Sequence, residues 1–239
     1  MRCVIELVIG ACEFVEQVGH NGRSVTSYHL LHQSSNLTVA IRLVETTPND
    51  QLETLKHDIS AIVTERIVPQ MHELLQRTDA DKIDPLSISL LKFIRVVSER
   101  LSWSPNTYAV ISQLSFALSR SNSSRVRICG VELATTLLGS TLHPVSVTHH
   151  IKRFMELWTT KHQFLDPTTR LSQLGFMSRI LCNPSLVPKL TFTHVAKMRV
   201  FLLTGTESNN TRVAACACKL LRVFTETFPC SKISMKPPL

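Results

Sequence analysis

Three short stretches in the second half of the chain resemble one another and decide the fold prediction. They read RVRICG at 125–130, RLSQLG at 170–175 and RVAACA at 212–217. Each begins with arginine and a branched apolar residue and has glycine or alanine at its sixth position. The arginines stand 45 positions apart (125 to 170) and then 42 positions apart (170 to 212). A period near 43 residues has room for two helices of about 15 residues each. One such pair cannot bury its apolar side alone, so the repeat predicts that successive pairs stack.

The sixth and first positions of these stretches suggest structural roles. A small residue at the sixth position, namely Gly130, Gly175 or Ala217, is expected to let its helix approach a neighbour closely. The opening arginine can lie over the adjacent turn and donate hydrogen bonds to carbonyl or carboxylate oxygens there, or it can contact a ligand. Both interpretations of the arginine remain open from the sequence.

The residues around these stretches follow a helical pattern almost throughout. Apolar residues recur on one helical face, as at Leu86 and Leu90, and strand-like alternation is confined to short pieces. Asp-Pro or Ser-Pro pairs at 84–85, 104–105 and 166–167 mark expected helix starts. At such a start the polar side chain accepts a bond from a free N–H, and proline has no N–H to leave unpaired.

The chain is therefore predicted to be all-α. Gly139 and Gly205 follow apolar helical runs and are expected to close those helices in the left-handed conformation that glycine adopts readily. The predicted helices cover 2–18, 25–33, 36–46, 50–67, 69–77, 85–101, 105–119, 123–138, 145–161, 167–182, 190–204 and 211–227.

The segments RVRICGVEL at 125–133 and RVAACACKL at 212–220 resemble the second helix of HEAT or armadillo repeats. Such helices carry a Val-Arg or Arg-Val near their start, a small residue in the middle and leucines after it. The resemblance implies an α-solenoid of stacked antiparallel helix pairs that serves as a binding scaffold. The Asp and Pro usual in the first helix of these repeats are absent or displaced, so HEAT and armadillo both stay open.

The predicted organisation has three parts. Residues 1–83 form an N-terminal helical segment with degenerate repeats, 84–228 hold the HEAT- or armadillo-like repeats, and 229–239 form a flexible tail. Met1 opens almost directly into an apolar helix without a polar capping repeat. The chain is therefore expected to be a piece or a short isoform of a longer solenoid.

Positive charge is concentrated in the second half of the chain. Residues 1–119 carry 10 basic and 13 acidic groups, whereas residues 120–239 carry 16 basic and 5 acidic groups. Seven basic residues lie on the predicted second helices, where their charges are expected to line one groove: Arg125, Arg127, Arg170, Arg179, Arg212, Lys219 and Arg222. Such a groove would bind an acidic or mixed peptide segment of a partner protein.

The alternative is a chromosome- or RNA-associated helical-repeat scaffold whose groove contacts nucleic-acid phosphates. Two Trp and two Tyr in the whole chain argue against stacking of single-stranded bases. In either case the chain is expected to belong to a larger complex.

The sequence holds no signature of catalysis. It lacks a GxSxG elbow, a Walker loop, an HExxH pair and the kinase motifs. His149 and His150 are adjacent and diverge on a helix, and His29 and His32 have no carboxylate or cysteine neighbour that would complete a metal site. The chain is therefore not expected to be an enzyme, and no cofactor or metal site is expected.

Seven cysteines without a CxxC pair suit a reducing compartment, where a free thiol packs as a small apolar group. The expected location is intracellular, in the cytoplasm or the nucleus. Since no run of 18 apolar residues occurs, no transmembrane helix is expected.

Overall fold

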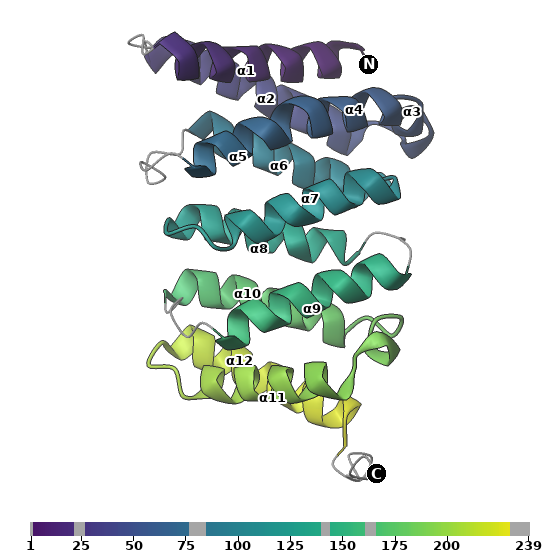
Figure 1. The fold of residues 1–239 in the computed structure, drawn as a ribbon, viewed down its shortest axis with the longest axis vertical. Helices are drawn as coiled ribbons and strands as arrows, with labels where there is room; N and C mark the ends of the chain where they lie inside the picture. Colours follow the sequence, from purple (N-terminus) through teal and green to yellow (C-terminus); the bar gives the residue numbers. More distant parts are fainter. Residues whose placement is uncertain (1, 22–26, 77–84, 140–143, 161–165, 230–239) are drawn as a thin grey trace. The chain divides into compact units, whose positions relative to one another are not determined.

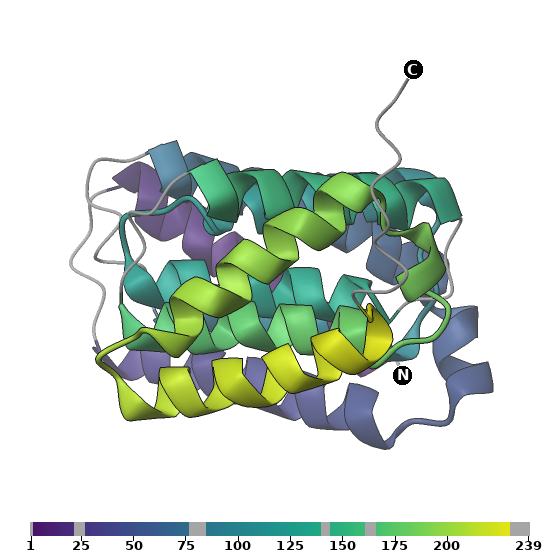
Figure 2. The same ribbon diagram turned by 90° about the horizontal axis from the view of Figure 1, so that it is seen from below.

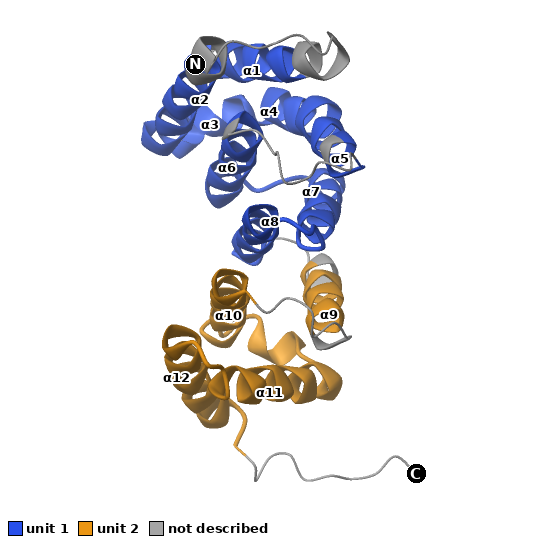
Figure 3. Cartoon of the chain, turned by 90° about the vertical axis from the view of Figure 1, so that its left-hand side faces the viewer, with its two compact units in different colours: residues 1–146 blue, residues 147–239 orange. Residues whose placement is uncertain are grey.

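The computed structural model describes residues 2–21, 27–76, 85–139, 144–160 and 166–229 (Figure 1). These ranges consist of helices and short connections and contain no strand, so the all-α prediction is confirmed for them. The chain divides into two compact units, unit 1 at residues 1–146 and unit 2 at residues 147–239 (Figure 3). This division falls inside the predicted repeat segment 84–228. Within the described ranges no helix has the length and apolar character needed to cross a membrane.

Unit 1 is a succession of helices close to the predicted ones. It contains α1 (Arg2–Asn21), α2 (Ser27–Thr46), α3 (Asn49–Thr54), α4 (Lys56–Ile62), the π-helix η1 (Val63–Ile67), α5 (Val68–Gln76), α6 (Pro85–Arg100), α7 (Pro105–Leu118) and α8 (Ser124–Leu137).

Two parts of unit 1 differ from the prediction. The sequence predicts a break between 33 and 36, because serine and asparagine favour helix caps. Instead α2 runs through this stretch, and Thr38 Oγ1 donates to the carbonyl of Ser34 (2.9 Å) while Leu37 is fully buried. Packing therefore overrides local preference. The predicted helix 50–67 is divided into α3, α4 and η1, and the wider π-helical turn ends just before Pro69.

The helices of unit 1 form two rows. One row consists of α2, α6 and α8, which contact one another in succession. The other consists of α1, the run from α4 to α5, and α7, and the rows join in the pairs α1–α2 and α7–α8 (Figure 3). Large side chains such as Phe93 of α6 and Tyr108 of α7 are buried in the core of this unit.

The contact between α7 and α8 depends on Gly130. A Cβ atom at this position would lie 2.5 Å from the backbone nitrogen of Ser119 and 2.8 Å from the carbonyl oxygen of Ser115. The predicted close approach is confirmed at Gly130. It is wrong at Gly175, which is exposed and where an added Cβ would have no atom within 4 Å.

Unit 2 contains α9 (Pro144–Thr160), which begins three residues before the unit boundary, α10 (Pro167–Leu181), the 3-10 turn η3 (Val187–Lys189), α11 (Phe192–Thr206) and α12 (Thr211–Thr227). α10 and α11 each pack against α12. Figure 2 shows α11 and α12 inclined to one another on either side of the loop that joins them.

An aromatic cluster joins α9, α10 and α11. The ring centroid of Trp158 lies 5.0 Å from that of Phe176 and 6.0 Å from that of Phe201. Phe154 completes the cluster at 5.4 Å from both Trp158 and Phe176. All four side chains are buried, so this cluster is the core that orients the helices of unit 2.

Polar caps begin several helices, as their sequences predict. Ser104 Oγ accepts a hydrogen bond from Thr107 N (3.2 Å), and Asp166 Oδ1 accepts one from Thr169 N (2.8 Å). These predictions are confirmed, whereas the third, at Asp84, lies outside the described residues.

The two glycines expected to close helices differ. Gly139 stands just past the end of α8. The prediction for Gly205 is wrong, because this residue lies inside α11 and faces α12, where a Cβ would be 2.8 Å from that of Ala217. A glycine after an apolar run predicts a helix stop, but here it serves a close contact between helices.

Candidate functional site

Four exposed cations of unit 2 lie on the adjacent helices α10 and α12, whereas Lys152 of α9 and Arg199 of α11 are exposed elsewhere. Arg179 is exposed on α10, and Arg212, Lys219 and Arg222 are exposed on α12. We call these four residues the α10–α12 basic face. The buried residues of α12 recur at three- and four-residue spacing, which turns the three cations of that helix toward the other side: Val213, Ala217, Leu220 and Phe224.

The α10–α12 basic face has little internal neutralisation. Arg222 pairs with Glu226 through Nε and Oε1 at 3.0 Å, and both side chains are well exposed. Within the described ranges no carboxylate forms an ion pair with Arg179, Arg212 or Lys219. Unit 2 holds thirteen Lys and Arg against four Asp and Glu, whereas unit 1 holds thirteen against fourteen. The face therefore attracts anionic partners.

Arg170 is tied into the packing of unit 2. Its Nη2 atom donates to the carbonyl of Phe201 (3.0 Å) and to Thr204 Oγ1 (3.1 Å). Its guanidinium carbon lies 3.6 Å from the centroid of the Phe201 ring. Burial lowers the pKa of Arg170 to about 10. The side chain thus links α10 to α11, which is the structural alternative that the sequence leaves open for an opening arginine.

Arg125 and Arg127 lie on α8 in unit 1, and only Arg125 is exposed. Arg127 is buried, and its Nη1 atom donates to the carbonyls of Ser121 (3.0 Å) and Asn122 (2.6 Å). It thereby closes the turn that precedes its own helix. The seven predicted residues therefore divide between exposed cations and cations that bond to the backbone.

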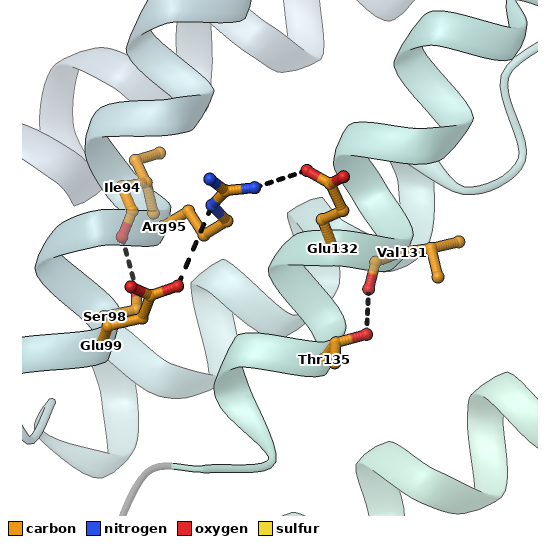
Figure 4. Close-up of polar contacts among 7 residues, drawn as sticks. All are labelled: Ile94, Arg95, Ser98, Glu99, Val131, Glu132 and Thr135. Carbon is orange, nitrogen blue, oxygen red and sulfur yellow. Dashed lines mark hydrogen bonds and ion pairs between the residues drawn. The ribbon is translucent and has the colours of Figure 1, made fainter. Parts of the chain in front are cut away.

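The surface of α6 and α8 carries charges that pair with each other. Arg95 Nη1 of α6 lies 2.6 Å from Glu132 Oε2 of α8, and its Nε atom lies 4.0 Å from Glu99 Oε1 (Figure 4). The nearby Cys129 is not an activated thiol, because burial and then Glu132 raise its pKa.

Sequence reasoning did not single out Arg100, at the end of α6. Its guanidinium donates to the carbonyls of Val44 (3.0 Å) and Thr47 (2.7 Å) and to Asn49 Oδ1 (2.7 Å). It also donates to the carbonyl of Glu45. The three backbone carbonyl groups lie at the carboxyl end of α2 and just beyond it, where the helix itself supplies fewer donors. Its acceptors stand more than 50 residues earlier, so no local motif could have revealed the role.

The histidines whose side chains the structure describes lie apart from one another or in different environments. His149 is exposed, whereas His150 is buried with its ring centroid 4.9 Å from that of Phe154. The side chains of His29 and His143 lie outside the described residues. In the part of the chain that the structure describes, no three His, Cys, Asp or Glu residues gather as metal ligands would.

Comparisons with protein-family models, with curated proteins and with solved structures find no match to this chain.

Proposed function

We propose that this chain is an α-solenoid of stacked helix pairs that acts as a non-enzymatic scaffold. Its α10–α12 basic face binds an acidic segment of a partner protein. The observation that carries the proposal is the set of exposed cations on two adjacent helices, three of which lack an ion pair within the described ranges. Carboxylates of a peptide can take the place of the missing acidic partners.

The burial pattern of α8, α10 and α12 supports the repeat. The buried stripe that begins at Val126 recurs at Thr169, 43 positions on, and at Val213, a further 44 positions on. Aligned in this way, Gly130 corresponds to Gln173 and Ala217, and Arg170 corresponds to Arg127. An alignment by letters alone is therefore displaced by two residues in its middle copy.

The binding of nucleic-acid phosphates by the same face is the alternative. The α10–α12 basic face offers exposed cations but no exposed aromatic side chain within the described parts of these two helices. Backbone contacts without base stacking would be expected, together with a steep loss of affinity as salt rises.

The test compares two labelled probes by fluorescence anisotropy over a range of salt concentrations: a twelve-residue peptide rich in Glu and Asp, and a single-stranded oligonucleotide of similar charge. The full chain with Arg179→Glu, Arg212→Glu and Lys219→Glu is expected to bind the peptide about tenfold or more weakly. All three side chains are exposed, so the helical circular dichroism should not change.

The matched control reverses three exposed cations of unit 1, Arg42, Lys92 and Arg120, and changes the net charge by the same amount. It should leave peptide affinity within about threefold. If it weakens binding as much as the first variant, attraction is non-specific and the proposed face is wrong. Tighter binding of the oligonucleotide, with several ions released, would favour the alternative.

A further inference from the structure

α11 carries an exposed apolar stripe that is separate from the α10–α12 basic face. Phe192, Val200 and Leu203 are 63%, 55% and 40% exposed, and Ala196 between them is exposed as well. At about 100° per residue these four positions fall on one side of the helix. We call them the α11 stripe. One other large apolar side chain of the described ranges, Val39 of α2, is exposed.

The opposite side of α11 is buried in unit 2, through Met198, Phe201 and Leu202. α11 is therefore apolar on two opposite sides, and helices of this kind are normally covered on both. The α11 stripe extends from 192 to 203, roughly 16 Å at 1.5 Å per residue. That length matches about three turns of a helix lying along it.

Charge around the α11 stripe selects the kind of partner. Lys197 and Arg199 stand on opposite edges of the stripe, at about 100° per residue. No Asp or Glu occurs between 187 and 206, and Glu207 follows only after the helix. A second copy of α11 would bring Lys197 and Arg199 against the same cations, which is unfavourable. An acidic partner would instead neutralise both edges.

We propose that the α11 stripe binds an amphipathic helix of a partner protein. The apolar side of that helix covers Phe192, Val200 and Leu203, and its Asp or Glu residues face Lys197 and Arg199. Helices that dock in this way use apolar anchors at three- and four-residue spacing. The inference does not depend on the α10–α12 basic face, since the residues and the helix are different.

The start of α11 is held in place for such a contact. Thr191 Oγ1 accepts from His194 N (3.3 Å), and His194 Nδ1 accepts from Thr191 N (3.3 Å). This reciprocal capping fixes the first turn, where Phe192 is exposed. The stripe is thus presented on a rigid element.

The test uses a labelled eighteen-residue helical peptide with leucines at positions 1, 5, 9 and 12 and glutamates beside them. A scrambled peptide of the same composition has no apolar face. We expect the full chain to bind the first peptide and to bind the scrambled peptide about tenfold or more weakly in anisotropy titrations. Equal binding of the two peptides would show attraction by charge alone and overturn the proposal.

Variants of the chain then identify which surface binds the amphipathic peptide. Val200→Ser with Leu203→Ser should weaken binding of the amphipathic peptide by about tenfold or more, and Lys197→Glu with Arg199→Glu by a similar factor at low salt. Lys92→Glu with Arg120→Glu in unit 1, which are exposed and lie outside both proposed surfaces, serves as the control with the same change of net charge and should leave this affinity nearly unchanged. A loss of affinity with Arg212→Glu and Lys219→Glu, but not with the α11 variants, would move the site to the basic face and refute the α11 stripe.

Light scattering measures molar mass and tests whether a second copy of the chain covers the α11 stripe. The chain should remain monomeric over the concentrations used for binding. A dimer that dissociates on Val200→Ser with Leu203→Ser would mean that the stripe pairs with itself, which contradicts the proposal.

Discussion

Unit 1 and unit 2 each hold thirteen Lys and Arg residues, but unit 1 has fourteen Asp and Glu and unit 2 has four. Both units contain bonded and exposed cations. In unit 1, Arg95, Arg100 and Arg127 each bond to carboxylate or carbonyl oxygens of their own unit. In unit 2, Arg170 does the same, but Arg212 and Lys219 on α12 are exposed and form no ion pair within the described ranges. A cation is therefore available to a partner only where the fold supplies no acceptor for it. The net charge of a unit does not distinguish bonded cations from exposed ones.

The largest expected effect separates a bonded arginine from an exposed one. Arg100→Ala leaves the carbonyl groups at the end of α2 without their donor and should lower the free energy of unfolding of unit 1 by about 2–3 kcal/mol. Arg212→Ala on α12 should change stability by less than about 0.5 kcal/mol. Urea unfolding of both variants measures the difference.

Each unit contains one tryptophan, so the two units can be followed separately. Trp103 is buried in unit 1 and Trp158 in unit 2. A Trp158→Phe background leaves Trp103 as the only indole, and its fluorescence then reports unit 1. Equal stability of Arg100→Ala and its parent in this background would refute the structural role of Arg100.

The next largest effect compares two glycines at unlike sites. Gly130→Ala places a Cβ against backbone atoms of α7 that cannot move aside, and we expect a net loss of about 2 kcal/mol. Gly175→Ala meets nothing and should stabilise α10 by about 0.5–1 kcal/mol through helix propensity. Thermal unfolding of the two variants should shift in opposite directions. A shift in the same direction would contradict the burial-based alignment of α8 and α10.

Substitutions of Arg170 test whether a bonded arginine of unit 2 contributes to stability as those of unit 1 do. Arg170→Leu removes two hydrogen bonds and the contact with the Phe201 ring, and should cost about 1–2 kcal/mol. Arg170→Lys keeps the charge but not the planar fork, and should recover only part of this loss. Full recovery by lysine would mean that charge alone matters at this position.

The Arg95–Glu132 pair should contribute less to stability, because both side chains are more than a third exposed. A double-mutant cycle with Arg95→Ala and Glu132→Ala should give a coupling free energy of about 0.5–1 kcal/mol in low salt. The coupling should shrink at about 1 M salt. A coupling free energy that does not change with salt concentration would indicate a buried pair and contradict the exposed geometry.

The smallest effect concerns the cap of α11 and its dependence on pH. Burial, followed by Lys197 of α11 and Lys152 of α9, lowers the pKa of His194, while Glu156 of α9 opposes this. A lowered pKa stabilises the folded state above pH 6.5, and this contribution is lost as the pH falls through the folded-state value. His194→Gln keeps an N3 partner for Thr191 but cannot titrate. Its urea midpoint should therefore vary less between about pH 7 and about pH 5 than that of the parent.

Local signals predict the helices well, because their causes are local. Ser104 and Asp166 cap their helices in the way that Ser-Pro and Asp-Pro pairs indicate. The break expected near Asn36 is absent, since burial of Leu37 depends on partners distant in sequence. Helix caps can thus be predicted from neighbouring residues, whereas the cases in which packing overrides them cannot.

The candidate site was predictable only in part, for a related reason. Residue type identifies the cations, and Arg179, Arg212, Lys219 and Arg222 are indeed exposed. Arg127 and Arg170 bond to backbone carbonyls. Every residue has such a carbonyl, so residue types do not indicate which one will accept the bond. Gly175 matches Gly130 in residue type but is exposed, because residue type alone does not show which side of a helix faces its neighbours.

The bond from Arg100 to the end of α2 also has a consequence for synthesis on the ribosome. Arg100 follows its carbonyl acceptors by 53 to 56 residues. At about 5–20 residues per second, the nascent chain carries these acceptors for roughly 3–11 s before the ribosome adds the arginine. During that interval the growing polypeptide has α2 without its terminal donor. The first third of the protein thus completes its native bonding only after later residues emerge.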